Sequence, residues 1–182
     1  MNKKLFIAIM ISLFTVGCSY NQSSFSEPQA KNLPDSAKQT DEDDWFSVYI
    51  NIDGKTDNDI NRAYVWVLDK RNSTASLAFV DSLYNISNAS IIPYTDPCRV
   101  LAEGCPDMRN IYSFIAEEGK EPKMLPSIGG LLGFGRDEGV IIMQGYQYYH
   151  AGGRYSKIEA YDADGNKIAS MNTNLKPDTL LR

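Results

Sequence analysis

The stretch YSKIEAYDADGNKIASM, residues 155–171, places Asp164-Gly165 between two segments in which apolar and polar residues alternate. An Asp-Gly pair in this setting is a strong signal for a two-residue turn that joins two antiparallel strands. That turn sets the register, and the predicted partners are Asp162 with Lys167, Tyr161 with Ile168, Ala160 with Ala169 and Ile158 with Met171. Alternation and turn agree, so the sequence predicts a β-hairpin here.

Strand-like segments also precede this hairpin. Residues 46–52 alternate, and residues 63–68, 77–80 and 89–92 are short apolar runs bounded by turn signals. Residues 139–149 form the longest such segment, and Gly145 inside it predicts a bulge or bend. Residues 125–138 (LPSIGGLLGFGRDE) are predicted to be a loop. Many short strands with frequent turn signals are typical of a β-sandwich or a small barrel, so we predict a mainly β fold.

Residues 106–118 (PDMRNIYSFIAEE) allow two interpretations. Pro106 at a first helical position, followed by Met108, Ile111 and Ile115 at helical spacing, favours one short helix. Alternatively, residues 111–116 form a strand that ends in a turn at residues 117–120. The sequence leaves both open.

The N-terminal residues 1–17 have the three parts of an export signal. Lys3 and Lys4 give a positive start, residues 5–16 (LFIAIMISLFTV) form an uncharged, mostly apolar run, and Gly17 precedes Cys18. A membrane-spanning helix needs about 20 apolar residues, so this run is too short to span a bilayer stably. Residues 1–17 are therefore predicted to be removed on export.

The residues around Cys18 resemble the lipobox of bacterial lipoproteins. In that family a Leu, a small residue and a Gly or Ala precede an invariant Cys, and Thr15-Val16-Gly17-Cys18 matches at the last two positions. Thr15 departs from the usual Leu, and Val16 is tolerated. The resemblance implies cleavage before Cys18, a diacylglycerol thioether on its sulfur and an acyl group on its amine. By resemblance to the enteric sorting rule, Ser19 implies the outer membrane, facing the periplasm, with the inner membrane and the cell surface as the alternatives.

The segment after Cys18 has the composition of a tether. Residues 18–44 are rich in Ser, Asn, Gln, Asp and Pro, and such a segment cannot bury enough apolar surface to offset its ordering entropy. We predict a flexible acidic linker that ends in Asp41-Glu42-Asp43-Asp44, a solvated run or a partner-binding motif. The single globular domain is predicted to cover residues 45–182.

The charge of the chain excludes some partners. Removal of residues 1–17 takes away Lys3 and Lys4, and the net charge changes from −5 to −7. An acidic chain lacks the positive surface that nucleic acids require, so no nucleic-acid partner is predicted. Anionic lipid head groups would repel it, so the membrane contact is assigned to the Cys18 lipid alone. No cofactor is predicted.

The chain has three cysteines: Cys18, Cys98 and Cys105. If Cys18 carries lipid, the other two are expected to pair in the oxidising compartment outside the cytoplasm. The predicted Cys98–Cys105 disulfide closes a loop of eight residues and would stabilise the domain by about 2.5 kcal/mol. A zinc site needs more ligands than two cysteines, and His150 is the single histidine, so no metal site is predicted.

Two segments share only their composition with chemical sites. Residues 53–59 (DGKTDND) cluster oxygen ligands as calcium loops do, but the EF-hand order is absent and such residues also dominate plain turns. Residues 129–135 (GGLLGFG) lack the Lys and Ser or Thr that complete a phosphate loop. They are predicted to be an irregular loop, or an exposed tip at Leu131, Leu132 and Phe134 that docks on a partner.

An aromatic band near the C-terminus is the candidate binding face. It contains Tyr146, Tyr148, Tyr149, His150 and Arg154, and tyrosine and arginine are enriched in contact hot spots. The alternative is an ordinary strand core or sheet surface. As a general base, His150 would need a nucleophile and an orienting partner, and the sequence has neither a Gly-x-Ser-x-Gly elbow nor a His-Glu-x-x-His motif.

These features predict a lipid-anchored envelope protein, not an enzyme, whose β domain binds a protein or another envelope component. One alternative is an immunity or inhibitor lipoprotein that neutralises a toxin or a lysozyme-like enzyme, because an acidic domain suits a basic target. A second alternative is an envelope hydrolase that uses His150.

Overall fold

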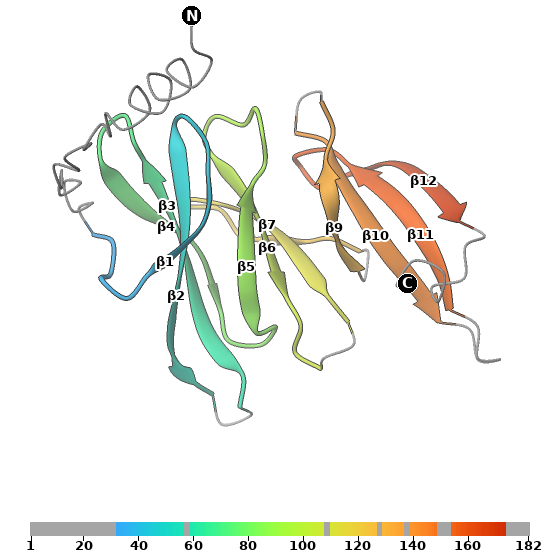
Figure 1. Cartoon of the computed structure of the whole chain (residues 1–182), viewed down its shortest axis with the longest axis horizontal. Coiled ribbons are helices and arrows are strands. Elements are labelled where there is room, and N and C mark those ends of the chain that lie inside the picture. Colours follow the sequence, from blue (N-terminus) through green and yellow to red (C-terminus); the bar gives the residue numbers. More distant parts are fainter. Residues whose placement is uncertain are drawn as a thin grey trace, which may run out of the picture.

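The structure, a computed structural model, describes residues 32–56, 59–107, 110–126, 129–136, 139–148 and 154–173. In these ranges the chain forms β-strands in three antiparallel sheets of four strands each, none of which closes into a barrel (Figure 1). The mainly β prediction is confirmed. The same ranges contain no helix long and apolar enough to cross a membrane.

Each sheet is built from four consecutive strands. Sheet A contains β1 (Lys38–Glu42), β2 (Phe46–Lys55), β3 (Asn61–Asp69) and β4 (Thr74–Asp81). Sheet B contains β5 (Ile86–Ile91), β6 (Arg99–Gly104), β7 (Tyr112–Glu117) and β8 (Lys123–Met124). Sheet C contains β9 (Gly129–Phe134), β10 (Ile141–Tyr148), β11 (Arg154–Tyr161) and β12 (Lys167–Thr173). Neighbours in a sheet are therefore also neighbours in the chain.

Sheet B is the middle layer, with sheet A on one side and sheet C on the other (Figure 1). Successive side chains of a strand point to opposite faces. On β6, Val100 and Ala102 accordingly belong to the core shared with sheet A, whereas Leu101 belongs to the core shared with sheet C. Facing Leu101 on β7 is Ile115, which lies in the same core as Leu101. The fold is thus two packed sandwiches that share one sheet.

The A–B core follows from the alternation seen in the sequence. In β2 every second residue from Phe46 to Ile50 is buried, and in β3 the same holds from Ala63 to Val67. Sheet B contributes buried residues from each of its three longer strands: Ile86, Ala89, Ile91, Val100, Ala102, Phe114 and Ala116. The C-side core is smaller and is completed by Ile141, Met143 and Tyr161.

The hairpin of residues 155–171 forms, but its turn is longer than predicted. Ile158 pairs with Met171 and Ala160 with Ala169, as predicted, whereas Tyr161 pairs with Lys167 because the register shifts there. The Asp162 carboxylate causes this shift. It accepts hydrogen bonds from the backbone N–H groups of Asp164 and Asn166 (3.0 and 2.7 Å) and so organises a turn of five residues between the strands.

Two further segments form strands, one of which was predicted only as an alternative and the other not at all. Of the two interpretations of residues 106–118, the helix is wrong and the strand is confirmed, because β7 pairs with β6 along its whole length. Residues 125–138 are not a loop throughout, since β9 pairs with β10. Leu131 and Phe134 pack against the B–C core, and only Leu132 is largely exposed (53 %), so the predicted exposed tip is not formed.

The predicted bulge of β10 lies elsewhere. Gly145 stays in register with Lys157 on one side and Gly129 on the other. The register shift toward β9 falls between Ile142 and Met143 instead. Glycine weakens a strand in general, but Gly145 is a regularly paired residue of β10.

The folded domain begins before Trp45. β1 occupies residues that were predicted to be linker, and it pairs with β2. Its side chains also reach sheet B: the Thr40 hydroxyl donates to the Ala89 carbonyl (2.8 Å), and the Asp41 carboxylate accepts from the Ile91 N–H (2.8 Å). These polar side chains are needed to satisfy the edge of β5, which explains why a polar segment is ordered.

The predicted Cys98–Cys105 disulfide is not formed, and both cysteines are free thiols. They flank β6, an extended strand of six residues. A strand rises about 3.3 Å per residue, so the two Cα atoms are separated by roughly 20 Å, whereas a disulfide requires less than about 7 Å. The strand that carries the middle of the core therefore keeps the two thiols apart.

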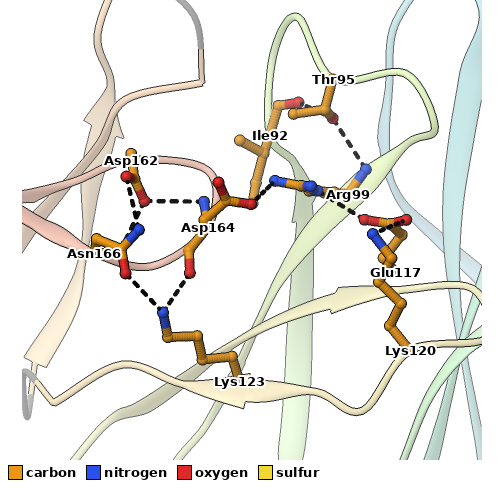
Figure 2. A network of polar contacts seen from close by, with 9 residues as sticks. All are labelled: Ile92, Thr95, Arg99, Glu117, Lys120, Lys123, Asp162, Asp164 and Asn166. Carbon is orange, nitrogen blue, oxygen red and sulfur yellow. Dashed lines mark hydrogen bonds and ion pairs between the residues drawn. The ribbon is translucent and has the colours of Figure 1, made fainter.

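A polar network connects sheet B with the β11–β12 turn (Figure 2). Arg99 donates through Nε to Glu117 (2.8 Å) and through Nη1 to the Asp164 carboxylate (2.6 Å). Lys123 Nζ donates to the Asp164 carbonyl and to Asn166 Oδ1 (2.5 and 3.1 Å). The two cations therefore hold the turn of sheet C against the middle sheet.

Glu117 is the buried acid of this network, with 7 % of its surface exposed. Burial by itself would raise the pKa of Glu117. The hydrogen bonds from Lys120 and Arg99, together with their positive charges, outweigh burial and hold this pKa below its ordinary value. The carboxylate is thus kept ionised by its partners.

Candidate functional site

The turn between β1 and β2 presents an exposed tryptophan on a fixed backbone. The Asp43 carboxylate accepts hydrogen bonds from the N–H groups of Trp45 and Phe46 (2.8 and 2.7 Å). The Trp45 carbonyl accepts one from the Lys70 N–H (2.8 Å). Phe46 points into the A–B core, so its neighbour Trp45 points outward and is 55 % exposed.

The loop between β5 and β6 presents a second exposed aromatic side chain. The Thr95 hydroxyl donates to the Ile92 carbonyl (2.8 Å) and accepts from the Arg99 N–H (3.0 Å), which braces the loop (Figure 2). Tyr94 adopts a left-handed backbone conformation (φ 62°) and is 77 % exposed. Such a conformation costs a non-glycine residue roughly 1–2 kcal/mol, and residues of this kind cluster at ligand-binding sites.

These two loops, one from sheet A and one from sheet B, form the walls of a groove of about 420 Å³. Its lining residues are Asp43, Asp44, Trp45, Phe46, Ile92, Pro93, Tyr94, Thr95 and Asp96. A smaller hollow of about 110 Å³ adjoins it and shares Phe46 and Asp96 with it. The larger volume lies in the range of typical ligand sites, roughly 300–1,000 Å³.

The groove is acidic. Three aspartates line it, and Asp69 and Glu118 are added along the smaller hollow, where Arg71 is the only cationic lining residue. The Cys98 thiol lines the smaller hollow, and this acidic environment affects its pKa. Burial first, and then the charges of Asp43, Asp41, Asp69 and Asp96, raise its pKa to about 12. A negative potential of this kind attracts cationic ligands.

Arg71 lies at the junction of the groove and the hollow. Its guanidinium donates to both carboxylate oxygens of Asp69 (2.8–3.2 Å), and it lies over the rings of Phe46 and Trp45, 5.0 and 5.7 Å from their centroids. Its bond to Asp96 is long (3.5 Å). The hydrogen bond from Arg71 is the main reason that the pKa of Asp69 is lowered.

The aromatic band predicted as the binding face lies in sheet C. Tyr146 and Tyr148 belong to β10 and Arg154 to β11, and the backbone register pairs Tyr148 with Arg154. Tyr149 and His150 lie outside the described residues. The groove is instead formed by loops of sheets A and B.

The oxygen-rich residues 53–59 and the Asp-rich β11–β12 turn contain ion pairs and turn hydrogen bonds among their own side chains and those of neighbouring strands. In the β2–β3 loop, Lys55 Nζ contacts the Asp59 carboxylate (2.6 Å), whereas Asp57 and Asn58 lie outside the described residues. In the β11–β12 turn, the Asp164 carboxylate is paired with Arg99. Among the described residues no group of three or more histidines, cysteines or carboxylates is placed to hold a metal ion.

The sequence contains the residues that line the groove, but their patterns predict other features. The sequence places the acidic run at residues 41–44 at the end of a linker, as a solvated run or a partner-binding motif, and Trp45 at the start of the domain. Tyr94 and Asp96 follow Pro93, which ends the short apolar run of residues 89–92, and no motif singles them out. Only the packing of sheet A on sheet B brings the two loops together. No protein-family model, curated protein or solved structure matches this chain.

Proposed function

We propose that this chain is a lipid-anchored cell-envelope protein whose β domain binds a basic protein partner through the groove between the β1–β2 turn and the β5–β6 loop. The observation that carries the proposal is the pair of exposed aromatic side chains, Trp45 and Tyr94, in an acid-lined groove. Exposed apolar patches with a polar rim are typical of interaction sites. Tryptophan and tyrosine are also the commonest anchors of binding energy.

The electrostatics favour a basic partner. The carboxylates of Asp43, Asp44 and Asp96 surround the aromatic side chains, and the mature chain has a predicted net charge of −7. Charge complementarity accelerates encounter and excludes acidic competitors. A basic toxin or lysozyme-like enzyme would fit this surface, so inhibition of such a target is a second candidate function of the same groove.

The groove is better suited to binding than to hydrolysis. Among its lining residues, Thr95 carries the one aliphatic hydroxyl that could act as a nucleophile. This hydroxyl is already bonded on both sides, to the Ile92 carbonyl and the Arg99 N–H. A nucleophile needs a neighbouring base to remove its proton. The Thr95 hydroxyl donates its proton to the Ile92 carbonyl, so no carboxylate of the groove accepts it.

The N-terminal sequence supports the anchor. The lipobox-like Thr15-Val16-Gly17-Cys18 would place lipid on Cys18, and a segment of about 20 residues would then lead to β1. The groove begins directly after β1, at Asp43 and Asp44, and so lies at the end of this strand that is farther from Cys18 in the sequence.

For the anchor, we expect the full chain made in a bacterial host to incorporate labelled palmitate, and the Cys18→Ser variant to incorporate none. The Cys105→Ser variant is the matched control and should be labelled as the wild type is. Mass spectrometry of the mature N-terminus should find Cys18 as the first residue, carrying acyl groups. Two or more acyl chains give stable membrane attachment. An unmodified Cys18 at this position would refute the anchor.

For the groove, we expect the double variant Trp45→Ala, Tyr94→Ala to recover at least about tenfold less partner from solubilised envelopes, because each hot-spot residue contributes about 2 kcal/mol or more. Both side chains are exposed, so the fold should be retained, which circular dichroism checks. The matched control is Leu83→Ala, Ile168→Ala, which removes two exposed apolar side chains elsewhere. Equal recovery by the groove variant and the control would reject the proposal.

A further inference from the structure

Arg71 shows how this corner of the protein binds a guanidinium group. A forked pair of hydrogen bonds to Asp69 fixes the guanidinium plane, and the rings of Phe46 and Trp45 lie beneath it. Forked pairing with a carboxylate and stacking on an aromatic face are the two interactions that distinguish arginine from lysine. The same two kinds of group continue along the groove beyond Arg71.

The groups beyond Arg71 have capacity for a second cation. Asp69 is engaged by Arg71 through both oxygens, whereas Asp96 receives from Arg71 only the long contact of 3.5 Å and is 60 % exposed. Asp44 is exposed at the opposite wall. Trp45 and Tyr94 keep more than half of their surfaces open.

We propose that the groove recognises an arginine side chain of the partner, with its guanidinium paired with Asp96 and stacked on the exposed aromatic side chains. This inference rests on the proposed function and specifies the residue that the partner contributes. The apolar lining from Phe46, Ile92 and Pro93 suits the methylene stem of that arginine.

Binding of a second guanidinium does not require Arg71 to leave. Arg71 keeps its forked bonds to Asp69 when Asp96 turns to the incoming group, so it loses only its longest contact. A lysine ammonium would find the same negative charges. It would lack the planar group that can pair with a carboxylate and stack on a ring at the same time.

The test uses the full chain in detergent micelles and three nine-residue Gly/Ser peptides that differ at the central position, which is arginine, lysine or citrulline. Binding is followed by NMR through the indole N–H signal of Trp45, and the signal of Trp66 serves as an internal reference. We expect the arginine peptide to bind at least about fivefold more tightly than the lysine peptide and tenfold more tightly than the citrulline peptide. The Asp96→Asn variant should lose this preference, whereas Asp53→Asn, an exposed aspartate in β2, should keep it.

The outcomes separate this inference from the proposed function. Equal binding of arginine and lysine peptides, or of arginine and citrulline peptides, overturns the arginine inference, as does the absence of any shift up to about 5 mM peptide. If those results accompany partner recovery that depends on Trp45 and Tyr94, the proposed function stands without the arginine. If the arginine peptide binds as expected but partner recovery does not depend on Trp45 and Tyr94, the proposed function fails instead.

Discussion

Replacement of Gly104 by alanine is expected to lower the free energy of unfolding by about 3 kcal/mol or more. A Cβ atom at this position would lie 2.2 Å from the Tyr84 carbonyl oxygen and 2.9 Å from the Ile86 N–H nitrogen. Both are backbone atoms, so no side-chain rotation can relieve the overlap. Gly104 pairs with Ile86 and Tyr112 at the end of β6, so the middle sheet would have to open to admit the methyl group.

Urea unfolding of the two proteins measures this effect, and Gly54→Ala is the matched control. Gly54 lies in β2 of sheet A, outside the core, and a Cβ there meets no atom within 4 Å. Its φ of 70° should cost alanine only about 1–2 kcal/mol. If Gly104→Ala were no more destabilising than Gly54→Ala, the close approach of the Tyr84 carbonyl to β6 would be wrong.

Replacement of Arg99 by methionine is expected to cost about 2–4 kcal/mol and to loosen sheet C from sheet B. The substitution keeps the apolar stem but removes the partner of buried Glu117, and breaking a buried ion pair from one side costs roughly 3–5 kcal/mol. Lys120 still contacts Glu117, which places the expected cost toward the lower part of that range. Asp164 loses its side-chain partner at the same time.

Hydrogen exchange identifies the source of this loss. Amide protons of the β11–β12 turn should exchange faster in Arg99→Met than in the wild type, and the double variant Arg99→Met, Glu117→Gln should regain part of the stability because no buried charge is left unpaired. Lys55→Met removes an exposed pair and should change stability by less than about 1 kcal/mol. An unchanged turn in Arg99→Met would show that the network does not hold the two sheets together.

The sequence was sufficient for the fold class because alternation is a local signal. Val48 and Ile50 alternate with polar neighbours, and the hairpin partners Ile158 and Met171 follow from one turn. The sequence does not predict a strand that forms only because it pairs with a neighbouring strand. β9 is rich in glycine and has low intrinsic strand preference, yet it pairs because β10 offers an open edge beside it.

The groove could not be predicted because its two walls come from segments that are far apart in the sequence. Trp45 and Tyr94 are about 50 residues apart in the sequence, and they meet only when sheet A packs on sheet B. The disulfide is predicted from the number of cysteines and from the oxidising compartment expected for an exported chain. Only the strand assignment of residues 99–104 shows that Cys98 and Cys105 are held at opposite ends of an extended segment.

The order of the strands has a consequence for how the chain folds. Each sheet is a meander of four consecutive strands, so every hydrogen-bonded strand pair joins neighbours in the chain. Short loops are closed at low entropic cost, and proteins dominated by local pairings fold faster than other β proteins of similar stability. We therefore expect rapid folding that proceeds sheet by sheet from the N-terminus as the chain emerges. The face of sheet B that packs on sheet C would be covered only after the strands of sheet C have docked.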